Sequence, residues 1–149
     1  MARYSGNTGF TLIEILVALL VTALGVMGLA AAQLNALKFE QTAEQRSHAS
    51  LLAYDMLDRM RANRAAALSG RYDIHFSNNG PTGDSVYAQD TRNWLASLAS
   101  QLSAGDGSIA RNGRSFTITV QWDESRLAET RTPDADGKHM QRFVFVTEL

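Results

Sequence analysis

An uncharged segment near the N-terminus divides this chain into two chemically different parts. Residues 15–37 contain no charged side chain, and within residues 15–32 the only polar side chain is that of Thr22. A helix over residues 15–32 would be about 27 Å long, and the apolar residues just before it lengthen it further. That length is enough to cross a hydrocarbon layer of about 30 Å. After Lys38 the composition is that of a soluble domain, so the sequence predicts a spanning helix followed by one folded domain.

Glu14 lies at the start of this apolar segment, and two common interpretations leave it unexplained. A cleaved secretory signal could end at Ala30-Ala31-Ala32, but the apolar stretch exceeds the usual signal core of about 7–15 residues. A plain membrane anchor explains the length, and Arg3 would keep the short end in the cytoplasm. However, a carboxylate at membrane depth costs a few kcal/mol and usually has a functional partner.

A third interpretation supplies the partner. If the chain is cut between Gly9 and Phe10, Phe10 carries a new α-ammonium group four residues before Glu14. On a neighbouring copy or another subunit, that cation would neutralise the carboxylate when the helices pack side by side. Because pairing removes the penalty of a buried charge, Glu14 would then favour assembly and set the register of a helical bundle.

The stretch "GFTLIEILVALL", residues 9–20, closely resembles the class III leader signal of type IV prepilins and type II secretion pseudopilins. The resemblance implies that Gly9 is the last leader residue, Phe10 the cleaved and N-methylated first mature residue, and Glu14 the assembly glutamate. It also implies three parts: a leader over residues 1–9, the membrane-spanning and filament-core half of a long helix over 10–37, and a periplasmic head over 38–149 that includes the second half of that helix.

The helix is expected to continue beyond the membrane, because no proline interrupts residues 10–68 and Gly70 is a suitable terminator. After Lys38 the pattern becomes amphipathic, and Asp55–Arg59 and Asp58–Arg61 are spaced to form ion pairs on the outer face. One face should pack against the head through apolar residues at helical spacing: Ala49, Leu52, Ala53, Met56, Leu57 and Met60.

The head is expected to contain a short helix over residues 91–102, with Asp90 as its N-cap. Its apolar stripe is more typical of a core than of a binding site, and consists of Trp94, Leu95, Leu98 and Leu102.

A β-hairpin is predicted next, with strands over residues 108–111 and 114–122 joined by a type I′ turn at Asn112-Gly113. Phe116, Ile118, Val120 and Trp122 alternate with polar residues, which indicates a half-buried strand, and residues 141–149 form a further strand. A small antiparallel sheet would pack on the long helix. This is the α+β type IV pilin-like fold, a lollipop with a long N-terminal helix.

Composition and spacing argue against catalysis and cofactors. The chain has no cysteine, its formal net charge is −1, and its three histidines, His48, His75 and His139, are scattered. "DADG" at residues 134–137 hints at calcium, but aligning its glycine with an EF-hand loop leaves non-acidic residues at the first and last positions. We expect no enzyme, no metal, no cofactor and no nucleic-acid partner.

Two further stretches, "GVMGLAAAQLNAL" (25–37) and "LLAYDMLDRMRANR" (51–64), resemble PilV-type minor pilins, also called pilus modification proteins. This implies a subunit that primes type IV pilus assembly near the tip and thereby supports twitching motility and cell adhesion. It implies that prepilin peptidase, other minor pilins, the major pilin and a tip adhesin are partners. It also implies residence in the bacterial inner membrane, with the head in the periplasm, and later in the pilus fibre.

The sequence leaves two alternatives open. A type II secretion minor pseudopilin shares the leader and the fold. A pilin-anchored binding module for DNA or a surface ligand would need an exposed basic surface, for which the candidates are Arg111, Arg114, Arg126 and Arg131.

Overall fold

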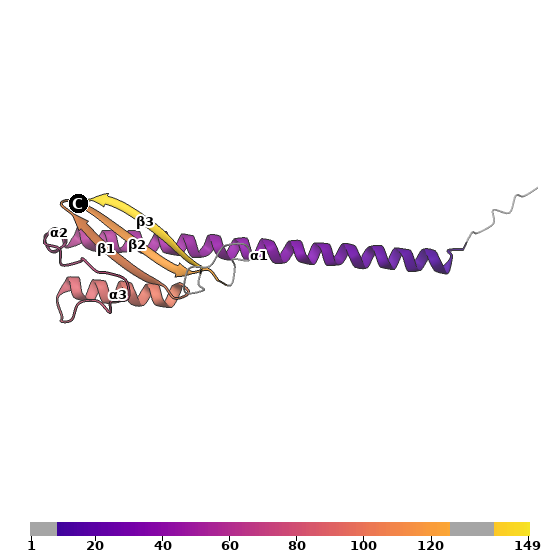
Figure 1. Cartoon of the computed structure of the whole chain (residues 1–149), viewed down its shortest axis with the longest axis horizontal. Helices are drawn as coiled ribbons and strands as arrows, with labels where there is room; N and C mark the ends of the chain where they lie inside the picture. Colours follow the sequence, from indigo (N-terminus) through magenta and orange to yellow (C-terminus); the bar gives the residue numbers. More distant parts are fainter. Residues whose placement is uncertain (1–8, 126–138) are drawn as a thin grey trace, which may run out of the picture. The chain divides into compact units, whose positions relative to one another are not determined.

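The computed structural model describes residues 9–125 and 139–149 and has the α+β composition expected from the sequence (Figure 1). The elements in chain order are α1 (Leu12–Ala62), α2 (Arg64–Leu68), α3 (Val86–Gln101), β1 (Asp106–Asn112), β2 (Ser115–Asp123) and β3 (Met140–Glu148). The chain divides into two compact units, an N-terminal unit (Met1–Phe39) and a C-terminal unit (Glu40–Leu149). The predicted long apolar helix and small antiparallel sheet are both present.

The predicted helix over residues 10–68 is in fact interrupted. α1 ends at Ala62, and Asn63 leaves helical geometry with φ −119° and ψ 50° before the short α2 begins. Asparagine is a weak helix former whose side chain readily finds other partners, and the Asn63 amide donates a hydrogen bond to the Tyr72 hydroxyl at 3.2 Å. That tertiary contact accounts for a break that periodicity alone does not reveal.

The predicted termination at Gly70 is correct. The Arg71 N–H donates to the Ala66 carbonyl and the Gly70 N–H to the Ala67 carbonyl, both at 3.0 Å, which is the Schellman arrangement. This arrangement needs a left-handed residue after the helix, and Gly70 has φ +77°.

The sheet has the order β1-β2-β3, with both neighbouring pairs antiparallel. β1 starts two residues earlier than predicted, and the turn is shifted by one residue. Asn112 pairs with Ser115, so Gly113 and Arg114 form the turn rather than Asn112 and Gly113. Only Gly113 has a positive φ, at +64°, which matches a type II′ turn with glycine first and not the predicted type I′.

The prediction for α3 was wrong at its N-terminus. The helix begins at Val86, and Ser85 is the N-cap residue in extended geometry, whereas Asp90 lies inside the helix. An acidic residue ahead of an apolar stripe resembles a cap, but the Asp90 carboxylate is used in contacts with α1 and Tyr72.

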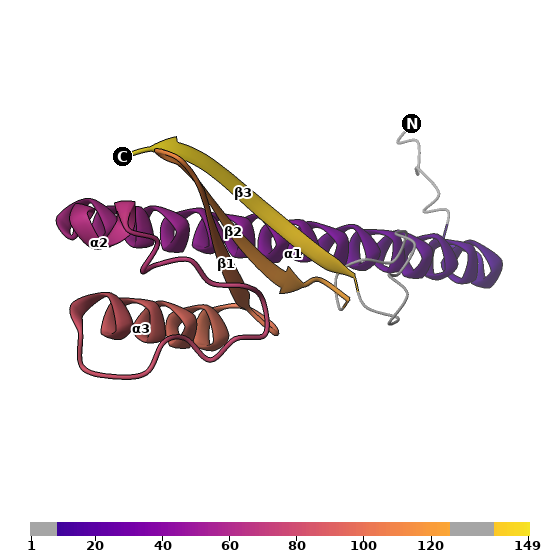
Figure 2. The same cartoon turned by 60° about the vertical axis from the view of Figure 1, so that its left-hand side comes forward.

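The core of the C-terminal unit lies between one face of the sheet, the last third of α1 and α3 (Figure 2). All six residues of the predicted α1 face are buried, and Phe116, Ile118, Val120 and Trp122 are buried on β2 as predicted. Trp94, which is fully buried, donates its indole N–H to the Leu52 carbonyl at 2.9 Å and so joins α3 to α1. The predicted ion pairs also form, Asp55–Arg59 at 2.9 Å and Asp58–Arg61 at 3.1 Å.

Candidate functional site

The N-terminal end of α1 carries the residues that the sequence predicts to be functional. Gly9 and Phe10 lie immediately before the helix, and Phe10 is 81% exposed. Thr11 acts as the N-cap: its hydroxyl accepts a hydrogen bond from the Glu14 N–H at 3.3 Å, and its carbonyl accepts one from Ile15. The Thr-x-x-Glu spacing is that of a capping box, so these residues define the helix start.

Glu14 is exposed and lies in the first turn of α1. A negative charge there is favourably placed relative to the helix dipole. Within residues 9–125 and 139–149, no cation lies within ion-pair distance of its carboxylate. Phe10 and Glu14 line a shallow groove on the helix surface together with Ile15, Ala18, Leu19 and Thr22. Glu14 is therefore accessible to a cation supplied by another molecule.

The surface of α1 that follows Glu14, up to residue 37, is predominantly apolar on all sides and exposed. Every residue from 10 to 37 is exposed, and the most apolar window of α1 has a mean hydropathy of 2.5 with none of it buried. The hydroxyl of Thr22 donates to the Ala18 carbonyl at 2.7 Å, so it needs no water. Burying a side chain such as Leu or Ile is worth about 1.5–3 kcal/mol. The segment therefore favours coverage by lipid or by other helices, and its length and composition suit membrane anchoring.

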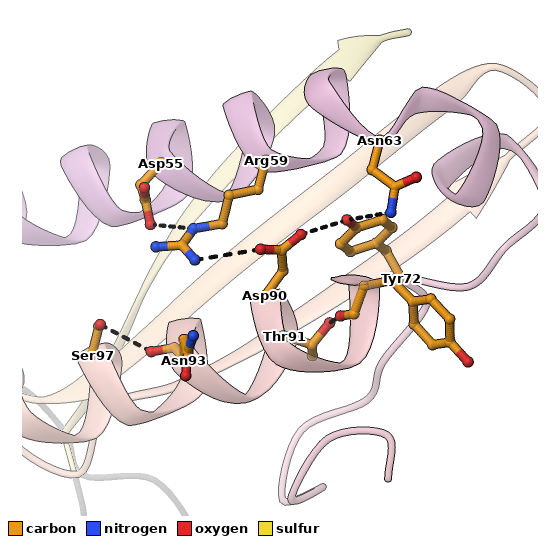
Figure 3. Close-up of polar contacts among 9 residues, drawn as sticks. Asp55, Arg59, Asn63, Tyr72, Asp90, Thr91, Asn93 and Ser97 are labelled. Atoms are coloured by element: carbon orange, nitrogen blue, oxygen red, sulfur yellow. Dashed lines mark hydrogen bonds and ion pairs between the residues drawn. The ribbon is translucent and has the colours of Figure 1, made fainter. Parts of the chain in front are cut away.

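The C-terminal unit contains a polar network of which the sequence predicts only the Asp55–Arg59 pair (Figure 3). The Tyr72 hydroxyl donates to Asp90 at 2.7 Å and accepts from Asn63, while Arg59 pairs with Asp90 at 3.5 Å and with Asp55. Burial and the bond to Asp90 raise the pKa of Tyr72 to about 12. The network holds α3 and the segment after α2 against α1. No local signal identifies it, because its members lie up to 35 positions apart.

The other predicted chemical features do not form a site in the part of the chain described. His48 lies 3.8 Å from Glu44, and no group of three potential metal ligands comes together in residues 9–125 and 139–149. Arg111 and Arg114 donate to the carbonyls of Gly113 and Leu149. The possible calcium stretch at 134–137 and the candidates Arg126 and Arg131 lie outside the described residues.

Comparison with known families identifies one similarity. Residues 4–30 match the prokaryotic N-terminal methylation motif, which includes Gly9, Phe10 and Glu14. This motif is structural and not catalytic, and it supports a type IV pilin-like protein that is a substrate of prepilin peptidase, in a pilus or a pseudopilus. No curated protein and no solved structure matches the chain.

Proposed function

We propose that this chain is a minor pilin that takes part in priming type IV pilus assembly near the tip. The observation that carries the proposal is the exposed apolar start of α1, with Glu14 in its first turn directly after Gly9 and Phe10. The methylation motif over residues 4–30 supports it. Prepilin peptidase would cut between Gly9 and Phe10, and Phe10 would then be methylated on its new amino group.

Glu14 supplies the assembly mechanism. In the bilayer an unpaired carboxylate costs about 2.5–3.5 kcal/mol at the helix centre and less towards the interface. When two processed subunits pack side by side, the α-ammonium of Phe10 on one neutralises Glu14 on the other. Since the penalty is removed only in the assembled state, the charge drives association and fixes the axial register of the helices.

Small residues in the same segment are compatible with close helix packing. A Cβ added to Gly25 or Gly28 would meet no atom within 4 Å, so nothing in the described part of the chain occupies the space beside either glycine. Neighbouring apolar helices could approach closely there. Before assembly the chain would reside in the bacterial inner membrane, with residues 38–149 in the periplasm, because Arg3 favours a cytoplasmic N-terminus.

The place near the tip rests on the resemblance of residues 25–37 and 51–64 to PilV-type minor pilins. On this basis the partners would be other minor pilins, the major pilin and a tip adhesin. A type II secretion pseudopilin would carry the same leader and use the same Glu14 mechanism. Co-purification with pilus subunits rather than secretion-system subunits distinguishes the two.

The test combines processing and assembly. Mass spectrometry of the protein from native membranes should find a chain that starts at Phe10 with one added methyl group. Glu14→Ala should still insert into the membrane but should no longer co-purify with partner pilins. Glu40→Ala, which removes an exposed glutamate of α1 outside the apolar segment, is the matched control and should assemble normally.

Two results would contradict the proposal. A mature chain that starts at Gln33 would indicate a secreted protein without a filament helix. Normal piliation and normal partner recovery with Glu14→Ala would refute the charge-pairing mechanism.

A further inference from the structure

β3 forms one edge of the sheet, and its outer side carries no further strand in the described part of the chain. It pairs with β2 along all nine residues from Met140 to Glu148, in a constant register without a bulge. The opposite edge differs, because Ile74 covers β1 by exchanging two backbone hydrogen bonds of 2.9 Å with Ile109. Of the two sheet edges in the described part of the chain, only the β3 edge therefore presents a long, regular row of backbone groups.

The pairing pattern shows which groups these are. The Glu124 N–H donates to the His139 carbonyl, and the Leu149 N–H donates to the Arg114 carbonyl. In an antiparallel pair such bonded positions alternate, so the odd-numbered residues of β3 bond to β2. The backbone groups of the even-numbered residues consequently point to the open side, and they belong to Arg142, Val144, Val146 and Glu148. None of these four has a backbone hydrogen bond on that side within residues 9–125 and 139–149.

The centre of this edge lacks the usual protection against pairing. Natural edge strands carry charged side chains, proline or bulges, or are short. β3 is nine residues long with no proline and no bulge, and its central outward-facing residues, Val144 and Val146, are uncharged and 54% and 62% exposed. Charges flank them on the same face, with Arg142 at one end and Glu148 at the other. The edge is thus apolar in the middle and oppositely charged at its ends.

The other face of the edge is apolar as well. The Phe145 ring contacts the Tyr54 ring of α1, with centroids 4.9 Å apart, and Leu51 and Tyr54 remain 65% and 48% exposed. Beside the start of β3 lies an open groove of about 470 Å³, lined by Arg46, Ser47, Ser50, Trp122, Gln141, Arg142 and Phe143. A strand added to β3 would place its inward side chains over this surface.

We propose that the open edge of β3 accepts an extended segment of a partner protein, which adds to the sheet as an antiparallel fourth strand. The charges define the segment: a basic residue opposite Glu148, apolar residues opposite Val146 and Val144, and an acidic residue opposite Arg142. Read in its own direction, the segment follows the pattern basic-x-apolar-x-apolar-x-acidic. Its backbone supplies affinity, and the four outward side chains supply register.

A second copy of β3 would satisfy the same pattern, because residues 142–148 read Arg-Phe-Val-Phe-Val-Thr-Glu. Pairing two copies antiparallel requires a two-fold axis normal to the sheet, which also reverses the direction of α1 residues 40–62. Two chains that enter one bilayer through their N-termini must run the same way, so a different protein fits better. This choice of occupant rests on the proposed function, whereas the open edge itself does not.

Disulfide trapping on the full chain in detergent tests the proposal, because the natural sequence contains no cysteine. The probe is the peptide Lys-Thr-Cys-Thr-Val-Thr-Glu, which places its cysteine opposite residue 146. In a glutathione buffer, Val146→Cys should trap this peptide about tenfold more than Val86→Cys does, since strand pairing raises the local thiol concentration. Val86 on α3 is the matched control, because both valines are 62% exposed.

Two changes test the register and the hydrogen bonding. Exchanging the terminal Lys and Glu of the peptide should reduce trapping about two- to fivefold, the usual worth of an exposed ion pair. Introducing Val144→Pro into the Val146→Cys variant removes a backbone N–H on the open side of β3 without breaking a hydrogen bond to β2. Peptide trapping by this double variant should fall to the level seen with Val86→Cys. Near-UV circular dichroism checks that this variant remains folded.

Equal trapping at residues 146 and 86, or trapping indifferent to the exchanged charges, would overturn the proposal. A second copy is tested by mixing Val146→Cys chains with Val144→Cys chains, because antiparallel pairing of two β3 strands in this register places residue 146 opposite residue 144. A disulfide between these two variants in excess of that between Val86→Cys and Val144→Cys would overturn the choice of partner and make the occupant a second copy. An unprocessed N-terminus would refute the proposed function while leaving these trapping results unchanged, so the two failures are distinguishable.

Discussion

Asp90 and Glu14 are both carboxylates on helices, but their surroundings differ. Asp90 receives the Tyr72 hydroxyl at 2.7 Å and the Arg59 guanidinium at 3.5 Å, so its charge is balanced inside the C-terminal unit. Glu14 has no ion-pair partner within the described residues. A balanced carboxylate stabilises the fold that contains it, whereas an unbalanced one beside an apolar surface favours association with a cation from outside.

Tyr72→Phe tests the balanced case. It should lower the free energy of unfolding by about 1–3 kcal/mol at pH 8, because Asp90 and Asn63 lose a buried hydrogen-bond partner. The pKa of Tyr72 is raised to about 12 in the folded state, from 10.0 in the unfolded chain. The stabilisation is complete below pH 10 and is lost as the pH rises towards 12. The wild type should therefore lose up to about 2–3 kcal/mol over that range and Tyr72→Phe should not.

Urea unfolding of the full chain in detergent, followed by the fluorescence of Trp94 and Trp122 in the core, measures both effects. Tyr87→Phe is the control, because hydrogen bonds with Ser85 and Arg71 lower the pKa of Tyr87 instead of raising it. If the stability of Tyr72→Phe fell as steeply above pH 10 as that of the wild type, Tyr72 would not be the group whose raised pKa causes the fall.

At the scale of elements, close contact between α3 and β1 determines how α3 packs on the sheet. Gly107 of β1 lies against Trp94 of α3, and a Cβ added at Gly107 would come within 2.3 Å of the indole ring and 2.7 Å of Leu98. The absence of a side chain at this strand position therefore allows the large indole to enter the core. The backbone of Gly107 has no positive φ, so space and not backbone conformation requires the glycine.

Gly107→Ala should accordingly lower the free energy of unfolding by about 1–3 kcal/mol or more, because Trp94 and Leu98 must shift in a packed core. The melting temperature, followed by near-UV circular dichroism of the tryptophans, measures this. Ser108→Ala on the same strand adds no atom to the core and should change the melting temperature little. A Gly107→Ala variant as stable as the wild type would show that the core adapts without cost.

At the scale of the whole molecule, the two units have opposite requirements. Among residues 9–125 and 139–149, every buried core residue belongs to the C-terminal unit, from Ala49 to Leu149. The N-terminal unit buries none of its apolar window and exposes large hydrophobic side chains along its length. The C-terminal unit can bury its hydrophobic surface internally, whereas the N-terminal unit requires lipid or other helices to cover its hydrophobic surface.

A fragment comprising residues 40–149 should therefore fold and remain soluble without detergent. Its urea midpoint, followed by tryptophan fluorescence, should equal that of the full chain in detergent, because no core residue is removed. The full chain should aggregate when the detergent is withdrawn. A fragment without near-UV circular dichroism would show that residues before 40 are needed for the fold.

Features that depend on local periodicity and spacing can be read from the sequence. The buried face of α1, the alternating β2 strand, the termination at Gly70 and the α+β class were all predicted, because each follows from neighbouring residues along one helix or strand. The candidate residues Gly9, Phe10 and Glu14 came from a linear motif, and the cut and methylation there remain predictions. Phe10 and Glu14 are both exposed.

Tertiary structure alone decided the features that depend on distant partners. The break at Asn63 and the use of Asp90 follow from contacts between residues 9 to 31 positions apart in the sequence. The indole of Trp94 likewise binds a carbonyl 42 positions away. The open edge of β3 exists only because β2 occupies the centre of the sheet, and strand order is not encoded in the periodicity of any one strand. Local pattern specifies which face of an element is apolar, but only packing specifies what covers it.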